Sequence, residues 1–127
     1  MGPSRRVLVV EDDEVIRELL DLALSGEGYN VLTAPHGAIA LDLIKSNGQP
    51  DVIFLDMYMP VMDGLEFSRA YSLTPGPHAP IVLLTAADQR AFQACEMRAD
   101  GYLSKPFDLE ELVQLASQYS PPPLFAA

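Results

Sequence analysis

Val52-Ile53-Phe54-Leu55-Asp56 is the stretch of sequence that decides the fold, because four apolar residues in a row end on a single carboxylate. A short, continuously apolar run of this kind is typical of a strand that is covered on both faces of a parallel sheet. The chain continues with Met57-Tyr58-Met59-Pro60 and Met62-Asp63-Gly64, in which proline and glycine favour turns. The stretch therefore predicts a buried strand with a charged residue where the strand meets the following loop.

Four further apolar runs recur along the chain, and stretches of helical period separate them. The runs occupy residues 7–10, 31–34, 81–84 and 102–104, and the helical stretches occupy residues 15–24, 39–44, 65–73, 89–98 and 109–116. Alternation of strand and helix is typical of parallel strands joined by crossover helices. The pattern predicts an α/β fold, a single doubly wound (βα)5 domain over residues 1–119, followed by a proline-rich tail at residues 120–127.

Helix-breaking residues close the first three helical stretches. Gly26 and Gly28 follow the first, Gly48 follows the second, and residues 74–77 (Thr-Pro-Gly-Pro) follow the third. Glycine adopts the left-handed conformation that commonly ends a helix, and proline lacks the amide hydrogen that a helix needs. These signals support the predicted helix ends.

Composition bounds the class of protein. The chain has 127 residues, 49% of them hydrophobic, which is the size of one ordinary globular domain. A formal net charge of -10 argues against direct binding of nucleic acid, because the phosphate backbone repels an acidic surface. The apolar run after Arg5 and Arg6 is too short for a signal peptide or a membrane span. We therefore expect a cytoplasmic domain that binds neither nucleic acid nor membrane.

Cysteine and histidine contribute little to the predicted chemistry. The single cysteine, Cys95, cannot form an intramolecular disulfide and is predicted to be a buried thiol in a reducing compartment. His36 and His78 have no neighbours at metal-ligand spacing and are predicted to be surface loop residues.

Polar residues follow the apolar runs at the same end each time. Glu11 and Asp12 follow the first run, and Asp56 ends the third. Thr85 follows the fourth run and Lys105 follows the fifth. Because an open parallel sheet binds ligands outside the carboxyl ends of its strands, we expect these five side chains to converge at one edge.

The chemistry of the five residues favours phosphoryl transfer. Three carboxylates held close together repel one another and need a cation, and oxygen-only ligands favour Mg2+. An Asp56 oxygen can attack phosphorus in line to form an acyl phosphate, while Lys105 neutralises charge on the phosphoryl oxygens. The Thr85 hydroxyl can donate a hydrogen bond to a phosphoryl oxygen. Pro106 restricts the backbone of Lys105 and permits a cis peptide bond before it.

Each of these residues also has a purely structural interpretation. The acidic run at residues 11–14 can cap the first helix, and Asp13 or Glu14 is predicted to do so. A turn residue, a helix cap and a solvated lysine are the alternatives for Asp56, Thr85 and Lys105. The coincidence of all five at one edge favours a site.

The chain resembles the receiver domain of two-component response regulators, the module of the stand-alone chemotaxis regulators. The residues that carry the match are 7–12, 56–60, 62–64, 84–86 and 102–107, and the resemblance extends over about residues 5–119. It implies a flavodoxin-like sheet of five parallel strands in the order 2-1-3-4-5. It also implies a signalling phosphoacceptor, not an enzyme, whose own chemistry can include self-phosphorylation and autodephosphorylation.

The resemblance assigns further roles. It implies that a histidine kinase or a histidine phosphotransfer protein phosphorylates Asp56, and that Glu11, Asp12, Asp56 and the backbone carbonyl of Tyr58 bind Mg2+. It implies that Tyr102 turns inward when Thr85 moves toward the phosphoryl group. This switch is expected to alter the binding surface around residues 86–119 for a downstream protein target that the sequence does not identify.

The sequence departs from the family pattern around the expected switch. The interval from Thr85 to Lys105 is shorter than is usual in the family, and Arg98 replaces a glycine that often ends the fourth helix. Tyr58 and Ala87 occupy positions that tune access of water to the acyl phosphate. Our hypothesis is that this pair gives a long-lived phosphorylated state.

Two other functions remain open at this point. A small phosphohydrolase like the haloacid dehalogenases also uses an aspartate nucleophile, Lys and Mg2+, but it needs a second acid where this chain has Tyr58. A receiver-like interaction scaffold that is never phosphorylated is the other alternative, although such modules usually lack one of the five site residues.

Overall fold

The computed structural model describes residues 5–86 and 99–119. The predicted fourth helix at residues 89–98 lies outside the described residues, as do Ala87, Cys95, Arg98 and the tail at residues 120–127. The elements are β1 (Arg6–Val10), α1 (Glu14–Gly26), β2 (Asn30–Ala34), α2 (Gly37–Asn47), β3 (Val52–Asp56), α3 (Gly64–Ser72), β4 (Ile81–Ala86), β5 (Gly101–Lys105) and α5 (Leu109–Tyr119).

The five strands form one parallel sheet in the order β2-β1-β3-β4-β5, which confirms the order that the resemblance implied. β3 lies at the centre and is buried along its whole length, as its apolar run predicted. From β1 the chain moves outward to β2 and then returns to β3 on the other side of β1. The strand order therefore reverses between β1 and β3, where α/β folds open a crevice for ligands.

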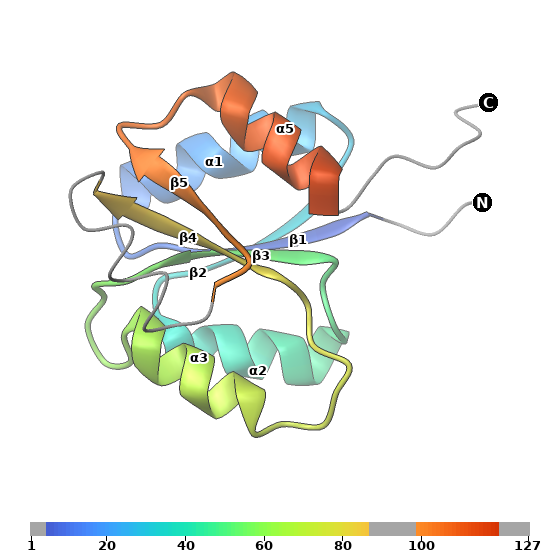
Figure 1. The fold of residues 1–127 in the computed structure, drawn as a ribbon, viewed down its shortest axis with the longest axis vertical. Coiled ribbons are helices and arrows are strands. Elements are labelled where there is room, and N and C mark those ends of the chain that lie inside the picture. Colours follow the sequence, from blue (N-terminus) through green and yellow to red (C-terminus); the bar gives the residue numbers. More distant parts are fainter. Residues whose placement is uncertain (1–4, 87–98, 120–127) are drawn as a thin grey trace.

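Helices cover both faces of the sheet. Figure 1 shows α1 and α5 on one face and α2 and α3 on the other. Because successive strand residues point to opposite faces, the apolar strands feed two cores. The core under α2 and α3 includes Leu8, Ile53, Leu55, Phe67 and Tyr71. The core under α1 and α5 includes Val9, Leu20, Leu24, Phe54 and Leu112. Burial of each such side chain stabilises the fold by roughly 1.5–3 kcal/mol.

Local signals set the helix ends as predicted. The Asp13 carboxylate accepts from the amides of Val15 and Ile16 at 2.9 and 3.1 Å, so Asp13 is the N-cap of α1. Gly28 (φ 91°) and Gly48 (φ 88°) take left-handed backbone conformations after α1 and α2. Both glycines supply a conformation that is costly for residues with a Cβ atom.

The strands extend further than their apolar runs, which corrects the predicted boundaries. β3 includes Asp56, and β4 continues through Thr85. β5 ends at Lys105, which is also the residue before a cis peptide bond to Pro106. The reason is strand pairing: Thr85 is in register with Ser104, so the ladder continues past the last apolar residue. Thr85 and Lys105 therefore lie within strands, at their carboxyl ends.

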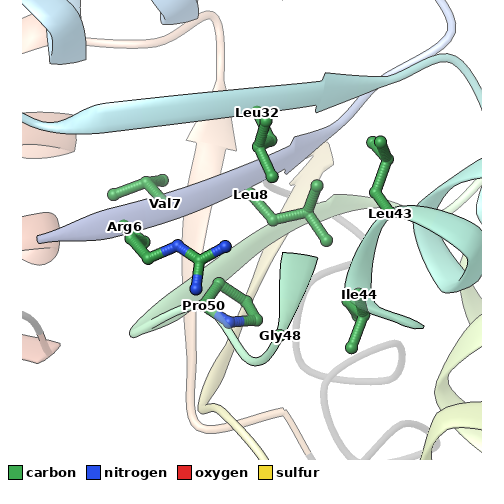
Figure 2. Close-up of a pocket in the computed structure, with 8 residues that line it drawn as sticks. All are labelled: Arg6, Val7, Leu8, Leu32, Leu43, Ile44, Gly48 and Pro50. Atoms are coloured by element: carbon green, nitrogen blue, oxygen red, sulfur yellow. The ribbon is translucent and has the colours of Figure 1, made fainter. Parts of the chain in front are cut away.

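A largely apolar hollow lies at the opposite, amino-terminal edge of the sheet (Figure 2). The Arg6 side chain lies beside it and donates through Nη2 to the carbonyl oxygen of Asn47, the last residue of α2. Carbonyls in the last turn of a helix have no partner within the helix, so this contact closes α2. The backbone amide of Arg6 donates to Asp51 Oδ2 at 2.7 Å.

Both histidines have contacts that the sequence did not predict. His36 is the N-cap of α2, and its Nδ1 atom accepts from the Ile39 amide at 3.4 Å. The His78 ring packs edge-on against Tyr71, with ring centroids 4.9 Å apart, and its Nε2 atom lies 2.8 Å from the Thr74 carbonyl oxygen. Both residues lie in loops, as predicted, and His78 is exposed; their contacts also fix local structure.

Candidate functional site

The predicted acidic residues and the lysine meet at the carboxyl edge of the sheet. Glu11 and Asp12 follow β1 directly, Asp56 is the last residue of β3, and Lys105 is the last residue of β5. Glu11 and Asp56 are 1% and 6% exposed, whereas Asp12 is exposed. One carboxyl oxygen from each of the three acids lies within 4.8 Å of the others. The predicted convergence of these residues is therefore present.

Lys105 pairs with the two buried carboxylates. Its Nζ atom donates to Asp56 Oδ1 at 3.2 Å and lies 3.3 Å from Glu11 Oε2. The contact with Glu11 is an ion pair without hydrogen-bond geometry. The lysine side chain is 31% exposed, whereas the two carboxylates that it contacts are buried.

Glu11 has one satisfied and one unsatisfied oxygen. Oε1 accepts from the backbone amide of Asp13 at 3.2 Å. Oε2 is buried and has no hydrogen-bond partner among the residues that the structure describes. Its one charged contact among the described residues is the Lys105 ammonium, which Asp56 shares, so a cation that completes its coordination would offset the cost of burial.

The electrostatics of the site show an excess of negative charge. Burial, reinforced by the Asp56 carboxylate and opposed by Lys105, raises the pKa of Glu11 from 4.5 to about 7. Burial also raises the pKa of Asp56, although Lys105 opposes the shift. Burial alone lowers the pKa of Lys105, but the Asp56 and Glu11 carboxylates outweigh it and the pKa is raised. One ammonium does not balance three carboxylates.

The acidic cluster is compatible with a metal site. It offers three carboxylates, one of them with an unsatisfied buried oxygen. No histidine or cysteine ligand joins the cluster within residues 5–86 and 99–119. A donor set of oxygens alone suits a hard divalent cation.

The loop between β3 and α3 frames the mouth of the site. Asp63 is the N-cap of α3 and forms a capping box with Glu66. The Met62 amide donates to the Pro60 carbonyl oxygen at 2.7 Å, so Val61 is the centre of a γ-turn at φ 68°. This positive φ was not predicted, because a β-branched residue rarely adopts it.

Gly64 lets this loop close against the strand. Its amide donates to the Met57 carbonyl oxygen at 2.8 Å. A Cβ atom at this position would lie 2.4 Å from the Asp56 carbonyl oxygen. Only glycine allows the start of α3 to approach the end of β3 this closely.

The remaining predicted residues surround the cluster at different depths. Thr85 is buried at 3% exposure, one position beyond Leu84, which is the register partner of Asp56. Tyr58 follows β3 and is 67% exposed, and Tyr102 on β5 is 43% exposed.

Sequence reasoning missed Arg17, which contacts the backbone of the acidic loop. Its Nη1 atom donates to the carbonyl oxygens of Glu11 at 2.8 Å and Asp12 at 3.4 Å. Every residue has a backbone carbonyl, so a contact from a side chain to the backbone does not produce a recognisable pattern of residue types in the sequence. The one available signal was a lone arginine in the first turns of a helix that follows an acidic loop.

Comparison with known proteins identifies the family. A model of the response regulator receiver domain matches residues 7–117. The response regulator MprA of Mycobacterium sp. (strain KMS) is 47% identical over 110 residues, which cover 85% of this chain and 47% of the relative. MprA of Mycobacterium bovis (strain BCG / Pasteur 1173P2) is 46% identical over 112 residues, covering 87% and 48%. The chain spans about half the length of these curated relatives.

Solved structures agree with this family. A putative response regulator from Chloroflexus aurantiacus J-10-fl superposes with a TM-score of 0.85 at 32% identity, covering 94% of this chain and all of that one (100%). The chemotaxis response regulator CheY4 of Vibrio cholerae gives a TM-score of 0.81 at 32% identity, covering 92% and 99%.

The chain belongs to the response regulator receiver domain family. It is thus a receiver of a two-component signal-transduction system, a signalling phosphoacceptor and not a classical enzyme. The comparison excludes the phosphohydrolase alternative. Across residues 5–86 and 99–119, no helix combines the length and the apolar character that a membrane crossing requires.

Proposed function

We propose that Asp56 is the residue that accepts the phosphoryl group. The observation that supports this most directly is its position: a carboxylate that is 6% exposed ends the central strand, within 3.2 Å of the Lys105 ammonium and beside two further acids. An Asp56 oxygen forms the new bond to phosphorus while the bond from phosphorus to the donor breaks. The electron pair of that bond leaves with the donor, for example the imidazole nitrogen of a phosphohistidine.

The proposed cofactor is Mg2+, held by Glu11, Asp12, Asp56 and the backbone carbonyl of Tyr58. The unsatisfied Oε2 atom of Glu11 and the oxygen-only donor set fit this ion. When bound, Mg2+ neutralises charge on the transferring phosphoryl group. Lys105 supplies a fixed positive charge for the same oxygens and orients the Asp56 carboxylate through its hydrogen bond.

Thr85 and Tyr102 form the proposed switch. Thr85 is buried close to the end of β3, where its hydroxyl can donate to a phosphoryl oxygen once one is present. Tyr102 lies on the edge strand β5 and its side chain is 43% exposed. A rotation of this side chain can therefore move the ring from solvent toward the interior. The change is a shift between two packings, and it alters the surface around residues 86–119.

The proposed phosphoryl donor is a histidine kinase or a histidine phosphotransfer protein that docks on α1. Three apolar side chains at helical spacing along α1 face solvent: Val15, Leu19 and Leu22, which are 75%, 45% and 70% exposed. Leu20 and Leu24 on the other side of the helix are buried, so the core does not use this stripe. Leu22→Ser should slow transfer from any phosphohistidine donor that modifies the wild type. It should leave modification by acetyl phosphate unchanged.

Tyr58 is proposed to slow loss of the phosphoryl group by shielding the acyl phosphate from water. Tyr58 lies two residues after Asp56, the last residue of β3, and its side chain is 67% exposed. Tyr58→Asn should speed the decay of the phosphorylated protein, and an unchanged decay rate would remove this role.

Reaction with acetyl phosphate or beryllofluoride in the presence of Mg2+ tests the central proposal, with intact mass or fluorine NMR as the readout. Wild type and Asp42→Asn, an exposed acid on α2, should both react, and Asp56→Asn should not. A folded wild type that binds Mg2+ but does not react would favour the phosphorylation-independent scaffold.

A further inference from the structure

We propose that Arg17 is a positioning residue that holds the acidic loop in the geometry needed for metal binding. This inference rests on the proposed Mg2+ site. It assigns to Arg17 a role in setting the position of Asp12, without contact between Arg17 and the metal.

The connection between β1 and α1 consists of residues 11–13 alone. All three of its carbonyl oxygens accept hydrogen bonds from Arg17. The Arg17 backbone amide donates to Asp13 O at 2.9 Å, and the guanidinium Nη1 donates to Glu11 O at 2.8 Å and to Asp12 O at 3.4 Å. The amide bond is the ordinary first bond of the helix, whereas the two guanidinium bonds are particular to arginine and fix the carbonyls of Glu11 and Asp12.

The position of Asp12 depends on this arrangement. Its two flanking peptide groups carry the carbonyls of Glu11 and Asp12, and the guanidinium fixes both. Glu11 has its own anchors, because Oε1 accepts from the Asp13 amide and Oε2 lies 3.3 Å from Lys105 Nζ. Asp12 is exposed and lies at the open end of the cluster. The position of the Asp12 carboxylate is therefore set by the conformation of the Asp12 backbone.

Arg17 and Lys105 lie on different sides of the acidic loop. Arg17 lines a surface hollow together with Thr33 of β2, whereas Lys105 belongs to β5. In the sheet order, β2 lies on one side of β1 and β5 on the other. Arg17 therefore holds the acidic loop from the β2 side of β1, while Lys105 contacts Glu11 and Asp56 from the β5 side.

Arginine suits this function better than lysine. A guanidinium presents five N–H donors in a rigid fork and can serve two neighbouring carbonyls at once. A lysine ammonium keeps the charge but is a flexible point donor. Substitution can therefore separate the charge of Arg17 from its hydrogen bonds to the loop. The hydrogen bonds favour Mg2+ binding, whereas the charge opposes it. A positive charge near the acids repels Mg2+, so its removal alone tightens binding.

Mg2+ titration by calorimetry, at constant pH and ionic strength, tests the role of Arg17. Arg17→Lys and Arg17→Met should both weaken Mg2+ binding, by about tenfold for Arg17→Met, as for other residues that orient metal ligands. Arg69→Gln removes an exposed arginine of α3 and should bind as the wild type does. Urea unfolding of each variant establishes that it is folded, and the amide NMR signals of Asp12 and Asp13 should move in both Arg17 variants.

The outcomes separate the explanations. Tighter binding by Arg17→Met with unchanged binding by Arg17→Lys would show that only charge acts, and unchanged binding by both would show no role; either result overturns the proposal. Absence of Mg2+ binding by folded wild type and Arg69→Gln would overturn the metal site itself and this inference with it. At saturating Mg2+, the Arg17 variants should regain most of the wild-type rate of reaction with acetyl phosphate, which a general loss of structure would not allow.

Discussion

Glu11 is a buried acid whose charge is supported by one backbone amide and one shared ammonium. We predict that Glu11→Gln stabilises the metal-free protein at about pH 8 by roughly 1–3 kcal/mol, because the variant removes a carboxylate whose pKa is raised to about 7. Urea unfolding in EDTA measures this gain. In excess Mg2+ the advantage should shrink or reverse, because an amide is a weaker ligand than a carboxylate.

Glu18→Gln is the matched control, since Glu18 is an exposed acid on α1. It should change stability by less than about 0.5 kcal/mol in either condition. A Glu11→Gln variant that is less stable than the wild type in EDTA would contradict the view that this carboxylate is held at an energetic cost.

The residues that bear charge at strand ends were predictable, and those that hold them in place were not. Glu11, Asp56 and Lys105 each follow or end an apolar run, so the topology of a parallel sheet alone brings them to one edge. Arg17 acts on backbone carbonyls, and its role depends on the path of a connection only three residues long. The backbone path of this connection cannot be predicted from residue type and spacing.

The start of α3 depends on close backbone contact at Gly64. We predict that Gly64→Ala destabilises the protein by about 1–3 kcal/mol, because its Cβ would lie 2.4 Å from the Asp56 carbonyl oxygen and either α3 or β3 must shift. The shift should also weaken Mg2+ binding. Thermal or urea unfolding and a Mg2+ titration measure the two effects.

Gly26 at the end of α1 provides the control for this substitution, because a Cβ there meets nothing within 4 Å. Gly26→Ala should leave stability unchanged or raise it by up to about 1 kcal/mol, since alanine loses less entropy in a helix. Equal losses from the two substitutions would show that close approach is not the reason for glycine at position 64.

The γ-turn between β3 and α3 stores strain at Val61. Its side chain is 78% exposed, so little packing compensates for the positive φ of 68°. Val61→Gly should raise the unfolding free energy by about 1 kcal/mol, the relief of strain exceeding the extra entropy of glycine in the unfolded chain. Val61→Ile keeps the β-branch and should give no gain. A loss of stability in Val61→Gly would indicate that the valine side chain makes a favourable contact.

At the scale of elements, apolar period predicted each described helix, and pairing decided where the strands end. The α1 stripe shows the limit of periodicity, because Val15 and Leu19 share the helical spacing of Leu20 and Leu24 but face solvent. The spacing of apolar residues identifies a helix. Which of its two apolar faces packs against the sheet depends on how the preceding loop orients the start of the helix. The ends of β4 and β5 were misjudged because the backbone ladder extends through the polar residues Thr85 and Lys105.

The whole domain was predictable as an α/β fold because strand and helix alternate from β1 to β4, and α5 follows β5. Its strand order came from family resemblance, since alternation alone does not determine on which side of β1 each later strand is added. That order has an electrostatic consequence for the entire molecule. It brings the carboxyl ends of β1 and β3 together and places acids that are distant in sequence within 4.8 Å of one another.

The stability of the metal-free protein should therefore fall as the pH rises from about 5 to about 8. The pKa of Glu11 is about 7 in the folded protein against an ordinary value of 4.5, so the folded state binds this proton more tightly than the unfolded state does. Its contribution is complete below pH 4.5 and is lost as the pH rises through about 7, and Asp56, whose pKa is also raised, acts with the same sign. The raised pKa of Lys105 contributes stability that is fully present below its ordinary value of 10.5, so it does not alter the slope in this range.

Urea midpoints in EDTA between about pH 5 and about pH 8 should decline for the wild type and much less for Glu11→Gln. Saturating Mg2+ should flatten or reverse the decline, because the metal binds the deprotonated acids. A wild-type midpoint that rises with pH in EDTA, or an equal slope in the variant, would show that the acidic cluster does not carry the excess charge inferred for it.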